Sequence, residues 1–87
     1  ISMAKVFARY GAEHQIYVNT IAPGLIETEQ TRSEFASGAA DEIIKSTTLL
    51  QRQGFPDDVV SALKFLIDEN QNYMTGQVIS VSGGAIL

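Results

Sequence analysis

Two short segments rich in β-branched residues, far apart in the chain, constrain its fold more than any other feature. The stretch from Gln15 to Ala22, QIYVNTIA, is apolar on both faces and stops at Pro23-Gly24, which favours a buried parallel strand. The stretch from Gln77 to Ser82, QVISVS, alternates and also predicts a strand. Residues 23–76 between them are long enough for a right-handed crossover. The sequence therefore predicts an α/β fold with parallel strands.

A helix is predicted before the first strand. Met3, Val6, Phe7 and Tyr10 recur at spacings of three and four and so share one helical face. This helix should run from the start of the chain to about Tyr10, with Gly11 as the left-handed residue that closes it. Because the chain opens inside a helical pattern and without Met, we expect it to begin partway through a larger protein.

The connection between the strands should hold a loop and two helices. Residues 23–37 are polar and loop-like, and residues 39–50 predict a weakly amphipathic helix with Ile43, Ile44 and Leu50 directed inward. The helix from Pro56 to Glu69 has the clearest signals. Proline is favoured at a first helical position, and acidic residues suit the positive end of the helix dipole. Its apolar stripe consists of Val59, Leu63, Leu66 and Ile67.

Composition and charge restrict the partners of the chain. Its 87 residues form one piece, residues 1–87, with no internal repeat or linker, and it has no cysteine to reinforce a small core. The net charge is −4 and the six basic residues are scattered, so nucleic acid is not an expected partner. No apolar run is long enough to span a membrane, and we expect a cytoplasmic protein. The single His14, expected to be exposed, predicts no metal site.

The loop after the first strand is the candidate ligand site. Ligands of open α/β sheets bind at the carboxyl ends of the strands. Here Gly24 permits close backbone approach, Pro23 stiffens the turn, and Thr28 adds a hydroxyl that donates and accepts. From these residues alone, a site for an amide-bearing ring and a simple strand-ending turn are equally good interpretations.

Three motifs in this chain resemble the short-chain dehydrogenase/reductase family. VNTIAPGLIET is similar to the family's V-N-x-x-x-P-G-x-I-x-T segment, and RQGFPDDV is similar to its R-x-G-x-P-x-D-V segment. The ending Y-x-T-G-Q-x-x-x-V-x-G-G is matched by Tyr73, Thr75, Gly76, Gln77, Val81, Gly83 and Gly84. The resemblance covers essentially the whole chain. It implies the C-terminal portion of a Rossmann-type doubly wound parallel sheet, in the order helix, strand, lid helices, helix, strand.

The resemblance also implies roles for particular residues. The backbone around Ile26 and the Thr28 side chain would bind the carboxamide of a nicotinamide cofactor, and Pro23 and Gly24 would shape that contact. Asn19 would be structural. Residues 29–50, hereafter the lid segment, would cover the substrate, with an apolar wall made of Phe35, Ile43, Ile44 and Leu49; core packing explains these four side chains equally well.

Parts of the family pattern are missing from the chain. It contains neither the T-G-x-x-x-G-x-G loop nor the Tyr-x-x-x-Lys pair, so we assign no catalytic residue to it. Lys5 has no tyrosine four positions earlier and is expected to be a solvated helix charge, and Ser82 stands where the family often has Asp. Alone, the chain is therefore expected to be inactive.

Two functions follow from the resemblance. In the first, the chain is part of an NAD(P)-dependent oxidoreductase that reduces a carbonyl substrate, with 3-oxoacyl-acyl-carrier-protein reductase the most similar type. NAD or NADP would bind only together with an N-terminal part. In the alternative, the chain is a truncated, non-catalytic module that associates with itself. Family members assemble through the elements that correspond here to the helix from Pro56 to Glu69 and the strand from Gln77 to Ser82. A homo-oligomer is therefore expected under either function.

Overall fold

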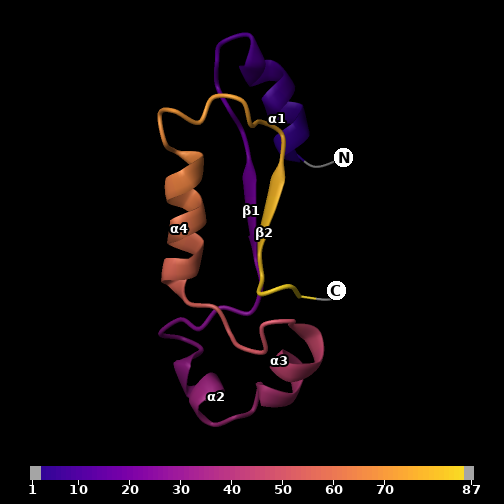
Figure 1. Ribbon diagram of the computed structural model, residues 1–87, viewed down its shortest axis with the longest axis vertical. Coiled ribbons are helices and arrows are strands. Elements are labelled where there is room, and N and C mark those ends of the chain that lie inside the picture. The colour runs from indigo at the N-terminus through magenta and orange to yellow at the C-terminus, as the bar shows by residue number, and fades with distance from the viewer. Residues whose placement is uncertain (1–2, 86–87) are drawn as a thin grey trace.

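The elements follow the predicted order of helix, strand, lid helices, helix and strand. The computed structural model describes residues 3–85 (Figure 1). Its elements are α1 (Met3–Ala12), β1 (Thr20–Pro23), α2 (Arg32–Ala36), α3 (Asp41–Thr47), α4 (Pro56–Leu66) and β2 (Val78–Val81). The predicted α/β class is confirmed. The part of the first predicted helix that falls on residues 1–2 lies outside the described residues.

The two strands pair in parallel, as predicted. Thr20 lies opposite Val78 and Pro23 opposite Val81, which gives a four-residue register. Helix α4 runs beside both strands, while α2 and α3 lie together beyond one end of the sheet (Figure 1). The long connection thus returns the chain to the end of the sheet where β1 begins, so that β2 can run parallel to β1, as the β-α-β interpretation requires.

Strand β1 is shorter than the predicted stretch from Gln15 to Ala22, because side chains replace part of the backbone ladder before Thr20, where the Val18 carbonyl still accepts from the Gly76 amide at 2.7 Å. The Val18 amide donates to the Thr75 hydroxyl at 3.0 Å. The Asn19 side chain accepts from the Gln77 amide and donates to the Met74 carbonyl, both at 3.1 Å. Asn19 therefore has the structural role that the resemblance implies. The prediction that β1 is buried is wrong for the described residues: its two ends are exposed and its two central residues are half-buried.

The role predicted for Gly11 is wrong. Gly11 lies inside α1 and is buried, and the left-handed residue that follows the helix is Gln15, with φ of 58°. A Cβ on Gly11 would lie 2.8 Å from the carbonyl oxygen of Ile16. Glycine is needed here for the close approach of two backbone segments, not for a left-handed turn.

The face of α1 that carries its large apolar residues is exposed. Tyr10 is 75% exposed and Phe7 52%, whereas the buried residues of the helix are the small Ala4, Ala8 and Gly11. Ala8 lies close to Gly76, where an added Cβ would come within 3.4 Å of its methyl group. Small residues therefore set the contact of α1 with the loop before β2.

The lid segment differs most from the predicted pattern. Residues Arg32–Ala36 form the short helix α2 inside the predicted loop, and α3 ends three residues before the predicted Leu50. It ends there because Thr48 is extended and bridges Ala85, after which the Leu49 amide donates to the Gly84 carbonyl at 3.3 Å. Of the three side chains predicted to point inward, Ile44 is buried, but Ile43 and Leu50 are exposed.

Helix α4 begins at Pro56 as predicted and ends at Leu66, three residues before the predicted Glu69. Asp68 starts a turn instead, since its carboxylate accepts from the Asn70 amide at 2.8 Å. Strand β2 is likewise one residue shorter at each end than predicted. Within the α4 stripe, Val59 and Leu66 are half-buried, whereas Leu63 and Ile67 are exposed.

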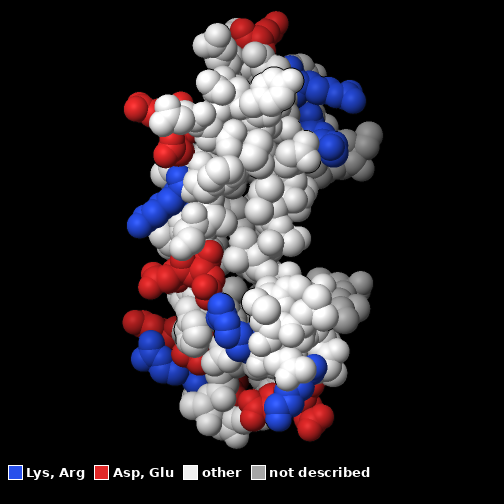
Figure 2. All heavy atoms as spheres, in the orientation of Figure 1, with Lys and Arg blue, Asp and Glu red and all other residues white. Residues whose placement is uncertain are grey.

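The chain is elongated and buries little of its apolar surface. Its extents are 49 × 24 × 21 Å and its radius of gyration is 15.7 Å, against about 12 Å for a compact chain of this length. Among the described residues, the buried apolar side chains are Ala4, Ala8 and Ile44. Figure 2 shows an uncharged face over the strands, with charged side chains gathered around the lid segment. Within residues 3–85, no helix is long and apolar enough to cross a membrane.

Candidate functional site

The candidate loop leaves the sheet directly from β1. The Gly24 amide continues the pairing by donating to the Val81 carbonyl at 3.0 Å. A Cβ on Gly24 would lie 2.9 Å from both the Cα and the Cβ of Ser82. Gly24 therefore allows the start of the loop to pass tightly against the end of β2, which fixes where the following residues lie.

Ile26 is held by a second parallel bridge, to Gly54. The Gly54 amide donates to the Leu25 carbonyl and the Glu27 amide donates to the Gly54 carbonyl, each at 2.8 Å. In a parallel bridge of this kind, the bonds are made by the neighbours of the central residue. The N–H and C=O of Ile26 itself consequently point away from Gly54.

These two backbone groups suit a primary amide. Such an amide carries one carbonyl acceptor and an NH₂ donor, and Ile26 presents one backbone donor and one acceptor along the same edge. Thr28, two residues further on, is exposed and adds a hydroxyl. The backbone of Ile26 and the hydroxyl of Thr28 are called the amide clamp below.

Thr31 organises this loop, and sequence reasoning missed it. Its Oγ1 accepts from the Thr28 amide at 2.9 Å and lies 3.2 Å from the Thr28 Oγ1. The Ile26 carbonyl oxygen lies 3.4 Å from the same Oγ1, as a second possible acceptor for its one hydrogen. The T-x-x-T spacing was the available signal, since a hydroxyl three residues away reaches back to the backbone in local turns.

A second group of side chains that sequence reasoning missed supports the loop; these side chains belong to residues 52–58 and are called the brace below. The Gln53 side chain donates to the Glu27 carboxylate at 3.2 Å, and Arg52 donates to the carbonyl of Gln53 at 2.9 Å and to the carboxylate of Asp58 at 3.3 Å. Asp58 also accepts from the Phe55 amide at 2.8 Å, which ties the brace to the first turn of α4. The R-x-G-x-P-x-D-V motif contains these residues, but a motif alone does not indicate their contacts.

The charge of Asp58 is stabilised by this arrangement. Two hydrogen bonds lower the pKa of the Asp58 carboxyl below its ordinary value. The bond from the Phe55 amide has the larger effect and the bond from Arg52 the smaller. Because the pair is largely solvent-exposed, it acts mainly as a geometric link between the loop at Arg52 and α4.

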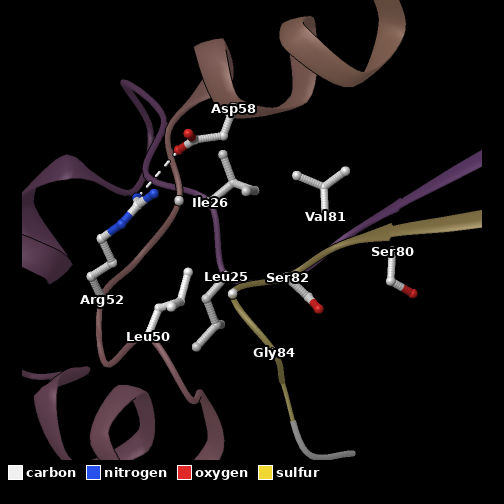
Figure 3. A pocket seen from close by; sticks show the side chains of 11 residues that line it. Leu25, Ile26, Leu50, Arg52, Asp58, Ser80, Val81, Ser82 and Gly84 are labelled. Atoms are coloured by element: carbon white, nitrogen blue, oxygen red, sulfur yellow. Dashed lines mark hydrogen bonds and ion pairs between the residues drawn. The ribbon is translucent and has the colours of Figure 1, made fainter. Parts of the chain in front are cut away.

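A pocket of about 370 Å³ lies beside the loop (Figure 3). In the close view, Leu25, Ile26 and Val81 surround the same space, and Arg52 reaches toward Asp58 along one wall. Of the four predicted binding residues, Ile26 lines this pocket, whereas Pro23, Gly24 and Thr28 do not. Ile26 is therefore the member of the amide clamp that borders the pocket, and Thr28 lies outside it.

The remaining candidates do not assemble into a site. His14 is exposed, as predicted, and lies 3.3 Å from the Glu13 carboxylate. Within the described part of the chain, no three metal-ligating side chains come together. The four lid side chains proposed as an apolar wall do not share one environment: Ile44 is buried and Phe35 half-buried, while Ile43 and Leu49 are exposed.

Comparison with known proteins places this geometry in a family. Residues 1–85 match the family described as enoyl-(acyl carrier protein) reductase. The chain is 37% identical over 84 residues to dehydrogenase/reductase SDR family member 4 of Rattus norvegicus, covering 97% of this chain and 30% of that protein. It is 39% identical over 87 residues to 3-oxoacyl-(acyl-carrier-protein) reductase FabG of Thermotoga maritima, covering 100% of this chain and 35% of that protein.

A solved structure agrees in both fold and sequence. The structure of 4-hydroxyisoleucine dehydrogenase complexed with NADH superposes with a TM-score of 0.86 at 35% identity, over 94% of this chain and 34% of that one. The chain thus spans about a third of the length of the proteins that it matches.

Proposed function

The chain belongs to the short-chain dehydrogenase/reductase family, and from this we propose that it supplies the nicotinamide-carboxamide site and the substrate lid of an NAD(P)-dependent oxidoreductase. The observation that carries the proposal is the bridge of Ile26 to Gly54. It directs the backbone donor and acceptor of Ile26 away from the bridge, along the edge where Thr28 adds its hydroxyl.

In the proposed role, the amide clamp orients the cofactor. The Ile26 backbone and the Thr28 hydroxyl would bind the carboxamide and so fix which face of the nicotinamide ring is turned to the substrate. Pro23 and Gly24 would set the turn that brings these groups to the carboxyl end of β1. When bound, the cofactor supplies the hydride. No Tyr-x-x-x-Lys pair occurs in this chain, so we assign no proton-transfer residue to it.

For the substrate we propose a carbonyl compound, with a 3-oxoacyl thioester as the first to test. The Thermotoga maritima relative is named for a 3-oxoacyl group carried on a protein. In this chain, the exposed Ile43 and Leu49 of the lid segment would offer apolar contact to an acyl chain.

The alternative proposal is that the chain acts only through self-association. Leu63 and Phe65 on α4 and Val78 on β2 are about half exposed, which leaves apolar surface on the elements expected to form a homo-oligomer. This proposal requires no cofactor, so cofactor binding separates it from the first.

Native mass spectrometry tests both proposals at once. The polypeptide expressed from the complete reading frame that encodes this chain would be sprayed with NADH or NADPH, and the number of copies and of bound cofactors read from the same spectrum. We expect a cofactor-bound oligomer, and a Thr28→Val variant that binds the cofactor about tenfold more weakly after loss of one hydrogen bond. Oligomers without cofactor would favour the module, and monomers without cofactor would contradict both.

A further inference from the structure

Thr31 stands at a helix start but does not cap it. It occupies the N-cap position of α2, where threonine commonly accepts a hydrogen bond from a backbone N–H of the first turn. No such side-chain bond is formed here. The hydroxyl turns back toward the loop instead, so the capping of α2 is given up for contacts with residues 26–28.

The proton count of this hydroxyl limits what it does. Oγ1 of Thr31 accepts from the Thr28 amide at 2.9 Å, which leaves its single hydrogen for one acceptor at a time. The nearest acceptor is the Thr28 Oγ1 at 3.2 Å, and the carbonyls of Ile26 at 3.4 Å and Thr28 at 3.5 Å are farther away. The hydrogen therefore has its best acceptor in the other threonine hydroxyl.

We propose that Thr31 is a positioning residue that sets the polarity of the amide clamp, an inference that rests on the proposed cofactor function. When Thr31 donates to the Thr28 Oγ1, the Thr28 hydroxyl keeps its own hydrogen for the ligand and donates it to the carboxamide oxygen. The Ile26 carbonyl is then left to accept from the carboxamide NH₂. Thr31 thus acts through Thr28 and the loop backbone, and touches no part of the cofactor itself.

The arrangement favours an amide over a carboxylate. A carboxylate has acceptors but no N–H donor, so it would place an oxygen against the Ile26 carbonyl with no hydrogen between them. The nicotinic acid analogue of the cofactor, which differs from it in this one group, is therefore the ligand that the clamp should reject.

A double-mutant cycle tests the inference. The dissociation constant of the preferred reduced cofactor would be measured by fluorescence for wild type, Thr31→Val, Thr28→Val and the double variant, using the polypeptide from the complete reading frame. We expect Thr31→Val to weaken binding about tenfold in the wild-type background and to add less than about twofold in the Thr28→Val background, since coupled residues are not additive.

Two further variants separate positioning from a general loss of structure. Thr31→Ser keeps the hydroxyl and should bind within about twofold of wild type. Ser61→Ala removes an exposed hydroxyl bonded to the backbone of Asp57, outside the loop, and should leave binding unchanged. The preference for the reduced cofactor over its nicotinic acid analogue should fall in Thr31→Val and be kept in Thr31→Ser.

The outcomes are distinguishable. Full affinity in Thr31→Val, strict additivity in the double variant, or equal losses in Thr31→Ser and Thr31→Val would each overturn the role of Thr31 while the cofactor function stands. If the wild-type polypeptide binds neither NADH nor NADPH, the proposed function fails and this inference fails with it.

Discussion

The sheet end of the molecule and the lid segment are held together in different ways (Figure 1). At the sheet end, the key contacts join residues far apart in sequence, such as the bonds of Asn19 to Met74 and Gln77. In the lid segment, hydroxyls bond to the backbone three or four residues earlier, as Ser37 does to Glu34 and Ser46 to Glu42. Contacts between distant residues fix how β1 and β2 lie relative to each other. Local contacts stabilise α2 and α3 themselves but do not fix where they lie, so their position depends on the contacts at the two ends of the lid segment.

The amide clamp lies where the two regions meet. Ile26 is fixed to Gly54 by backbone bonds on the sheet side, and Thr28 is fixed to Thr31 on the lid side. The clamp is therefore attached to the sheet through Ile26 and, through Thr28, to the first helix of the lid segment. Substitutions placed in each region should separate these two contributions.

The largest difference is expected between two glycines. Gly24→Ala would put a Cβ 2.9 Å from the backbone of Ser82, where nothing flexible gives way, and should destabilise the fold by about 3 kcal/mol. Gly38→Ala, in the lid segment, meets the movable Asp41 carboxylate at 3.1 Å and has φ of 80°, so it should cost about 1 kcal/mol. Urea denaturation measures both, and equal or reversed costs would contradict the comparison.

A smaller difference is expected between two polar side chains. Asn19→Ala leaves the half-buried Met74 carbonyl and the Gln77 amide without their partner and should destabilise the fold by about 2 kcal/mol. Ser46→Ala removes only exposed local bonds, to the carbonyls of Glu42 and Ile43, and should change stability by less than about 0.5 kcal/mol. Both are read from urea midpoints at constant slope. A large loss in Ser46→Ala would show that the lid segment is held more tightly than its local contacts indicate.

The smallest effect concerns acid. The pKa of Asp58 is lowered in the fold, so its carboxylate contributes stability that is fully present above its ordinary value of 3.8 and is lost as the pH falls through the lower folded value. We therefore expect Asp58→Asn to lower the melting temperature slightly at pH 6. The difference from wild type should shrink as the pH falls below 3.8. Thermal scans from pH 6 to pH 3 check this, and a gap that widens in acid would have the wrong sign.

Residue patterns predicted the parallel pair well and its limits poorly. The long connection and the β-branched runs were sufficient for the pairing, because they depend on overall pattern. The limits of β1 depend on Asn19 and Thr75, whose side chains replace backbone bonds in a way that no periodicity records. Helix α2 escaped prediction for a related reason: it has five residues and no side-chain cap.

The residues of the candidate site were likewise predicted only in part. Ile26 and Thr28 were assigned through the family resemblance, and their assignment as cofactor contacts stays a prediction. Thr31 and the brace of Arg52, Gln53 and Asp58 were missed, because their roles depend on contacts that only the folded chain displays. Sequence spacing identified the loop, but not the groups that hold it.

The bridges at the two ends of the lid segment determine what an insertion in this segment would cost. The bridges of Ile26 to Gly54 and of Thr48 to Ala85 fasten the chain on either side of the lid helices. Residues inserted near Gly38, at the far end, would lengthen a loop whose ends are already fixed, and each doubling of a flexible loop adds only about 0.6 kcal/mol of closure entropy. The lid segment can thus change in length at its far end while the strand register, and the loop attached to it, keep their geometry.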